Sequence, residues 1–209
     1  MTTNVFSSGS QDRLLVIMSR DKSLVEPKVL AGVLQQLGVA SDYQVYSRIP
    51  EEGEGFGLFC LIESESSHQH WQQDLESMGL ECRLYSTQRP IVPAGFVKLP
   101  ATHILVSVAM TPNAASEKSF NDWYTQEHIP MLSQTPGWLA SRRFNLISST
   151  GEAPKHLALH AWVDMSIFER SEYKAAVNTP WRTEVIDQVI QRERLVLQSQ
   201  SAASDMNDA

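Results

Sequence analysis

The segment WYTQEHIPML, residues 123–132, concentrates side chains that can exchange protons. At helical spacing, Trp123, Tyr124, Glu127 and His128 fall on one face. An imidazole can act as a general acid or base near neutral pH, and a phenol can donate a hydrogen bond to a carbonyl or enolate oxygen. The same spacing also suits a packed aromatic face with His128 at the helix end, so the segment alone leaves both roles open.

Pro130 predicts where this helix ends. Proline has no N–H to donate and disfavours helical geometry at the preceding residue, Ile129. His128 would then lie in the last helical turn, where the helix dipole favours a charged imidazole. A histidine that only caps the helix end is therefore the competing interpretation.

A second candidate group is HLALHAW, residues 156–162. On a strand, His156, His160 and Trp162 point to one face. With no carboxylate or cysteine partner identifiable nearby, we expect no metal site here and expect a pocket-lining role for one histidine. Because Lys155 precedes it, His156 is expected at an exposed strand end.

Two adjacent arginines, Arg142 and Arg143, must point to opposite faces of their strand. An inward arginine could bind a carboxylate or enolate oxygen, and it could equally form a structural ion pair.

Motifs for other chemistries are absent from the sequence. It has no GxGxxG, Walker A or GxSxG segment, so no nucleotide site or serine nucleophile is indicated. Cys60 and Cys82 have neither zinc-binding spacing nor the context of a nucleophile. If the chain is an enzyme, we expect histidine acid–base chemistry in an apolar pocket, without a cofactor.

The elements that must position these residues follow one order twice. Residues 12–89 predict β-α-β-β-α-β, with helices over residues 23–38 and 67–80. Residues 102–198 repeat the order, with helices over 113–132 and 166–190, the second broken at Pro180 with Thr179 as its N-cap. A proline-rich linker, residues 90–101, separates the halves, and the polar tail, residues 199–209, is expected to be disordered.

The predicted fold class is therefore α+β, with two tandem ferredoxin-like units. Each unit has helices on one face of its sheet, so the other face must be covered. The two sheets could cover each other and form a pseudo-dimeric α+β barrel within one chain, which the short linker favours. The alternative is two independent lobes that each pair with a second chain, and a homodimer is compatible with either arrangement.

Composition excludes several partners. The 209 residues carry a net charge of −7, which disfavours binding to nucleic acid, and there is no basic run for an anionic membrane. No apolar run approaches the roughly 18 residues of a membrane span, and the N-terminus lacks a secretory signal pattern. With only two cysteines, we expect a reduced, cytoplasmic protein.

The second half also resembles a known family. SFNDWYTQEHIPMLSQTPGW, followed by RRFNLI, HLALHAW and EYKAAVNTPWR, is similar to the EthD-like group of the dimeric α+β barrel superfamily, especially its fungal members. The likeness covers roughly residues 103–198, and its core is an aromatic pair, a histidine four residues on, and then x-Pro. The first half lacks this motif, and we interpret it as a degenerate copy with a scaffold role.

The resemblance implies a pocket between the helices and the sheet, with His128 as the family's histidine. Relatives include cyclases, decarboxylases, isomerases and cofactor-free monooxygenases, often in secondary-metabolite pathways. We therefore expect a cofactor-independent lyase, cyclase or isomerase that acts on a hydrophobic, oxygenated polyketide- or terpenoid-like molecule. His128 and Tyr124 are the expected catalytic residues. The expected substrate-binding residues are Phe120, Trp123, Met131, Trp138, Arg143, His160, Trp162 and Trp181.

Two alternatives remain at this point. A pericyclase would only hold a reactive substrate in shape, and would depend on Trp123, Trp138 and Trp162 more than on His128. A binding or stress-response barrel would bind a small molecule without turning it over.

Overall fold

The computed structural model describes residues 5–6, 13–19, 43–52, 55–62 and 69–200. The helix predicted over residues 23–38 and nearly all of the predicted tail lie outside these ranges. Among the helices that are described, none has the length and apolar character of a membrane span.

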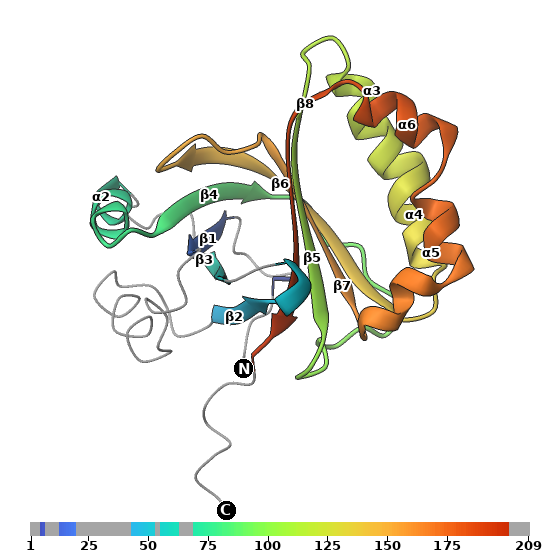
Figure 1. The fold of residues 1–209 in the computed structure, drawn as a ribbon, viewed down its shortest axis with the longest axis horizontal. Helices are drawn as coiled ribbons and strands as arrows, with labels where there is room; N and C mark the ends of the chain where they lie inside the picture. Colours follow the sequence, from blue (N-terminus) through green and yellow to red (C-terminus); the bar gives the residue numbers. More distant parts are fainter. Residues whose placement is uncertain (1–4, 7–12, 20–42, 53–54, 63–68, 201–209) are drawn as a thin grey trace, which may run out of the picture.

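Eight antiparallel strands close into a barrel, in the order β1-β3-β2-β8-β5-β7-β6-β4 (Figure 1). The predicted α+β class is confirmed by this arrangement. Within the ring, the first half contributes β4-β1-β3-β2 and the second half β8-β5-β7-β6, so the same order recurs. The halves join where β2 pairs with β8 and where β4 pairs with β6. The strands are β1 Arg13–Ser19, β2 Tyr43–Arg48, β3 Phe56–Ile62, β4 Glu81–Thr87, β5 Ile104–Pro112, β6 Trp138–Ser149, β7 His156–Trp162 and β8 Val189–Ser199.

A layer of short helices covers the outer face of the second half, against β5, β7 and β8 (Figure 1). Helix α2, Gln69–Ser77, lies on the far side of the barrel and contacts β4, and η2 is the short turn Pro50–Glu52. The helical layer consists of α3 Glu117–Trp123, η3 Tyr124–His128, α4 Ile129–Ser133, η4 Met165–Glu169, α5 Ser171–Ala176 and α6 Pro180–Ile186.

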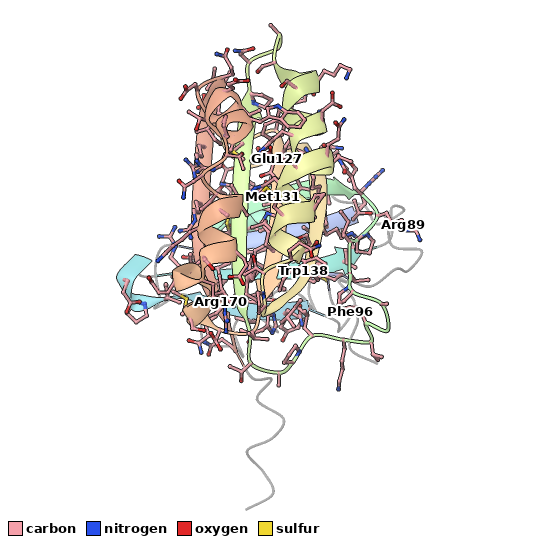
Figure 2. The ribbon with its side chains drawn as sticks, turned by 90° about the vertical axis from the view of Figure 1, so that its right-hand side faces the viewer. Arg89, Phe96, Glu127, Met131, Trp138 and Arg170 are labelled. Carbon is pink, nitrogen blue, oxygen red and sulfur yellow. The ribbon has the colours of Figure 1, made fainter. Side chains whose placement is uncertain are left out.

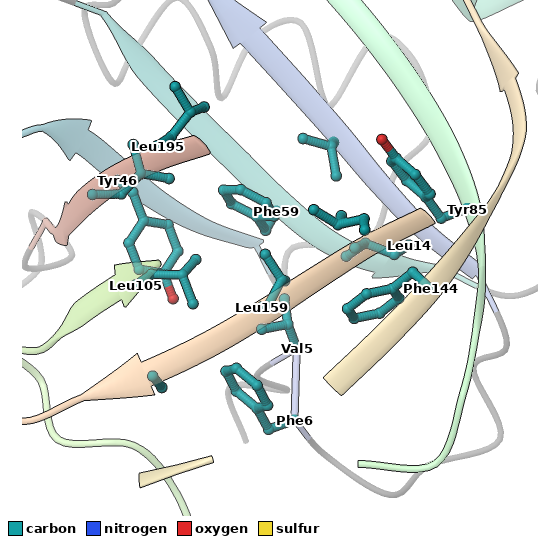
Figure 3. Close-up of a cluster of buried hydrophobic side chains, with 14 of the residues drawn as sticks. Val5, Phe6, Leu14, Tyr46, Phe59, Tyr85, Leu105, Phe144, Leu159 and Leu195 are labelled. Atoms are coloured by element: carbon teal, nitrogen blue, oxygen red, sulfur yellow. The ribbon is translucent and has the colours of Figure 1, made fainter. Parts of the chain in front are cut away.

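Alternation along the strands fills the barrel with apolar side chains from both halves. Leu14, Phe59 and Tyr85 of the first half pack with Leu159 and Leu195 of the second (Figure 3). Each large apolar side chain that is removed from water contributes about 1.5–3 kcal/mol. This shared core fills the interior of the barrel and covers the inner face of both halves.

The helix that carries WYTQEHIPML does not end before Pro130, contrary to the prediction. It continues through α4 to Ser133 because residues 124–128 form a π turn, in which the Ile129 N–H bonds to the Tyr124 carbonyl five residues back. Pro130 then begins a new α-helical turn, where no N–H is required. His128 therefore lies inside the helix, away from its C-terminal end, and the argument from the helix dipole is wrong.

Other boundaries also differ slightly from the expected ones. The last helix ends at Ile186, and β8 begins at Val189, earlier than predicted. The N-cap is confirmed: Thr179 accepts a hydrogen bond from the Arg182 N–H, and Pro180 is the first helical residue. Between β4 and β5, the proline-rich segment makes a single isolated bridge, from Ile91 to Ser141.

Candidate active site

A cavity of about 170 Å³ lies between the helical layer and the outer face of the barrel. Its sheet wall comes from β5, β7 and β8, and its helical wall from the helix that carries the π turn and from α5 and α6. All of its lining residues belong to the second half. They are Val106, Val108, Met110, Trp123, Tyr124, His128, Leu132, His160, Trp162, Tyr173, Val177, Arg182, Ile186, Arg192 and Arg194.

The π turn determines which side chains of the helix reach this cavity. Residues five apart in an α-helix point in different directions, since one turn takes 3.6 residues. In this helix, Trp123 and His128 stack with ring centroids 4.3 Å apart and an interplanar angle of 21°. The wider turn makes this contact possible, and π turns of this kind are frequent at functional sites.

Three rings converge across the cavity. The Tyr124 ring lies 5.5 Å from His128 and 6.5 Å from His160, and the two imidazoles are 5.9 Å apart. All three side chains are buried. Trp123, Tyr124 and His128, which the sequence interpretation placed on one helix face, all line the cavity, and the β7 strand adds His160 and Trp162 from the opposite wall.

His160 is held by a polar chain behind the cavity. Trp138 Nε1 donates to Ser141 Oγ over 3.0 Å, and Ser141 Oγ lies 2.8 Å from His160 Nδ1. Ser141 is fully buried, so these bonds orient the imidazole in a dry environment.

Burial favours the neutral forms of the two histidines and the tyrosine of the site. Burial is the main cause that lowers the pKa of His128 to about 3; a hydrogen bond to the Ala176 backbone opposes this shift, and the charge of Arg182 adds to it. Burial also holds the pKa of His160 well below its usual value, with smaller contributions from His128 and Arg143. Burial raises the pKa of Tyr124 to about 12.

Several buried nitrogens at the cavity lack hydrogen-bond partners among the described residues. A buried polar atom without a partner typically costs 1–3 kcal/mol, so native proteins contain few of them. Their concentration here makes this cavity the candidate site. The atoms are Trp123 Nε1, His128 Nδ1, His160 Nε2 and Trp162 Nε1.

Three arginines that sequence reasoning missed also line the cavity: Arg182 from α6, and Arg192 and Arg194 from β8. Arg192 and Arg194 are two apart on a strand, so they share its outer face. That alternation was a usable signal, but the predicted strand began after Arg192.

Half of the predicted site residues do not line the cavity. Phe120 packs behind Tyr124, and Arg143 lies over the far side of the Tyr124 ring, 4.4 Å from its centroid, while donating to Asn121. Trp138 is connected to His160 only through hydrogen bonds to Ser141. Met131, which lies along the same helix in Figure 2, and Trp181 pack against neighbouring apolar clusters.

His156 is buried, so its expected position at an exposed strand end is wrong. Its Nδ1 is 2.8 Å from Asn145 Oδ1, and its Nε2 lies 3.4 Å from Glu117 Oε1. The helical layer reaches past the end of β7 and covers it. In the described parts of the chain, no three histidine, cysteine or acidic side chains lie close enough together to hold a metal ion.

Comparisons with known proteins identify the fold. No family model matches the chain, and no curated protein matches its sequence. An anthrone oxidase-like protein matches with a TM-score of 0.65 and 12% identity, over 97% of this chain and 98% of its own. A ferredoxin-fold protein of Listeria monocytogenes related to antibiotic biosynthesis monooxygenases matches with 0.57 and 12%, over 92% and 98%. A heme-degrading enzyme of the same organism matches with 0.53 and 9%, over 90% and 99%.

At such low identities, the likeness establishes only the fold, because proteins of one fold perform many functions. The chain has a ferredoxin-like α+β barrel fold. The EthD-like assignment and its fungal type stay predictions.

Proposed function

We propose that this chain is an enzyme that converts a small hydrophobic, oxygenated molecule in the second-half cavity by acid–base chemistry, without a cofactor. The reaction would be of lyase, cyclase or isomerase type. The observation that carries the proposal is the pair of buried, neutral histidines, each with one unpartnered nitrogen, in a cavity walled by tryptophans.

The hydrogen-bond network supports His128 as the proton acceptor. Its ring bonds to the backbone of Ala176, while Nδ1 has no partner among the described residues. A backbone carbonyl can only accept, so Nε2 carries the hydrogen of the neutral ring and Nδ1 keeps its lone pair. Nδ1 is therefore the atom that would take a proton from the substrate.

His160 has the complementary polarity. Trp138 can only donate to Ser141 Oγ, and we propose that the Ser141 hydroxyl in turn donates to His160 Nδ1. A neutral imidazole carries a single N–H, which is then at Nε2 and would donate to a substrate oxygen. The Tyr124 hydroxyl is a second donor for a carbonyl that becomes an enolate.

The experiment is an activity screen against oxygenated aromatic polyketide-type compounds, with products detected by mass spectrometry. Removing a positioned acid–base group typically costs 10²–10⁴-fold in turnover, and we expect a loss in this range for His128→Ala. The matched control is His156→Ala, which removes a buried histidine that does not line the cavity and should leave turnover within a few-fold.

Other outcomes would identify the alternatives. Product formation that survives His128→Ala but not Trp123→Ala or Trp162→Ala would indicate a pericyclase. Saturable binding with no product across the screen would indicate a binding barrel. Either result would overturn the proposed role of His128.

Oxidation by O₂ is a second candidate for the same cavity. It is favoured by the match, over nearly the full length of both chains, to a protein described as anthrone oxidase-like. In such a reaction His128 would again remove a proton, giving an enolate or phenolate that O₂ attacks. Oxygen consumption coupled to product formation would distinguish it from the lyase, cyclase and isomerase reactions.

A further inference from the structure

Three arginines place positive charge at the cavity. The guanidinium groups of Arg182 and Arg192 make no ion pair with any carboxylate of the described residues. The groups that act electrostatically on Arg182 are Arg192, Tyr173 and Tyr124; burial first, and then the like charge of Arg192, lowers its pKa. Arg194 adds a third positive charge and lies over the Phe168 ring.

Neither Glu193 nor Glu127 neutralises these arginines, and Glu184 of α6 forms no ion pair among the described residues. Glu193, between the two β8 arginines, points to the other face of the strand and binds Arg83 through both carboxylate oxygens at 2.8 Å. Glu127, on the helix opposite, accepts a hydrogen bond from Thr179. A chain with a net charge of −7 thus keeps a cluster of positive charge at this cavity.

Two of the aromatic residues that line the cavity are deeply buried. Trp123 and Trp162 are each 1% exposed, whereas Arg192 is exposed and Arg182 is half-buried. The cavity therefore has an apolar interior and a cationic mouth. Like-charged arginines held together without carboxylates favour an anion between them, and the planar guanidinium matches a carboxylate through paired hydrogen bonds.

We propose that the substrate is an acid: a small, flat hydrophobic molecule whose carboxylate binds Arg182 and Arg192 while its body lies against Trp123 and Trp162. This inference takes the same cavity as the proposed function and names the class of its substrate. A carboxylate at the mouth also places negative charge near the imidazole of His128, which makes its protonation easier.

The test compares 2-naphthoate with its uncharged counterpart, 2-naphthamide, by isothermal titration calorimetry with the full-length protein. Hydrogen bonds to charged groups are worth enough that we expect the carboxylate to bind roughly 10- to 100-fold more tightly. The double variant Arg182→Gln/Arg192→Gln should lose most of this preference. Arg170→Gln, an exposed arginine of the helical layer outside the cavity (Figure 2), should keep it.

Thermal unfolding of each variant checks that the fold is intact. Equal binding of the two compounds, binding of neither, or a preference that survives the double variant would overturn the inference. Tight carboxylate binding without any turnover would support the inference and count against the proposed enzyme. Turnover of a neutral substrate, with no carboxylate preference, would do the reverse.

Discussion

At the scale of single residues, hydrogen bonding distinguishes His103, which is fully bonded, from the two histidines of the cavity. His103 is buried, and both of its nitrogens are bonded, to the Pro100 carbonyl at 2.8 Å and the Tyr46 hydroxyl at 3.0 Å. A histidine that serves only packing is expected to be satisfied in this way. His128 and His160 each leave one nitrogen unpartnered at the cavity, which is a cost to stability that a ligand would remove.

The first prediction concerns stability against pH. Because the folded-state pKa of His128 is about 3 and the unfolded value is near 6.5, the unfolded chain binds the extra proton between these values. Stability is therefore retained above pH 6.5 and lost as pH falls toward 3, by about 1.4 kcal/mol per pH unit for each such histidine. Urea unfolding of wild type and His128→Phe at several pH values measures this.

The variant should show a shallower acid dependence, by about one proton. Tyr124→Phe is the control, because its phenol stays neutral across this range, and its pH dependence should match that of the wild type. An identical slope for His128→Phe and wild type would show that His128 is charged when folded, against the neutral role assigned here.

The spacing of residues along one helix and one strand predicted much of the cavity lining but not its positive charge. Trp123, Tyr124 and His128 followed from one helix, and His160 and Trp162 from the alternation of one strand. The arginines come from two further elements, α6 and β8, that meet only in the tertiary structure. Nothing in a single sequence pairs them across that distance.

At the scale of elements, the π turn is the feature that the helical pattern concealed. Trp123 and His128 are five residues apart, a spacing that an α-helix does not bring into contact. A proline within a helical pattern ordinarily predicts a helix end. Here Pro130 lies in the first turn of α4, and the helix continues. The site therefore depends on one extra residue within the helix.

The second prediction changes the length of this turn. Inserting one alanine after the exposed Gln126 should keep the helical circular dichroism signal. His128 would then lie six positions after Trp123 and rotate by about 100° away from it, and we expect 2-naphthoate binding to fall by 10-fold or more, since stacked and desolvated contacts are lost.

Pro130→Ala is the matched control and should retain binding, because the π turn keeps its length. Wild-type affinity in the insertion variant would show that the π turn does not position the ligand site.

At the scale of the whole molecule, the two halves share one core while only one of them lines the cavity. The strand order of the second half repeats that of the first, which supports our proposal of two tandem ferredoxin-like units, residues 12–89 and 102–198, that mimic a dimer. In this proposal the first unit covers the inner face of the second and serves as scaffold.

The third prediction follows from the shared core. Phe59 of β3 is 1% exposed and packs among residues of both halves (Figure 3). Phe59→Ala should cost about 3–5 kcal/mol and weaken the second half by the same amount. Hydrogen exchange of the β7 amides, His156–Trp162, measures this at a distance from the substitution.

A conservative control is Phe59→Leu, which should cost much less because most of the buried volume remains. Unchanged protection of β7 in Phe59→Ala would show that the halves are independent domains.

The α+β class and the order of the described strands were predictable, since periodicity distinguishes strands from helices. The strand pairs that close the ring were not, because β2 must meet β8 and β4 must meet β6. Those contacts join Tyr46 with Ser199 and Thr87 with Phe144, which are far apart in sequence. The ends of the helices were also hard to predict, because a proline can lie at the start of a helical segment as well as after its end.

The most direct test of the central claim is the electron density of the cavity in crystals grown with 2-naphthoate. We expect the naphthalene rings to lie against Trp123 and Trp162. The carboxylate should be within hydrogen-bond distance of Arg182 and Arg192, and His128 Nδ1 should face the ligand. An empty cavity, or a ligand bound elsewhere on the barrel, would contradict it.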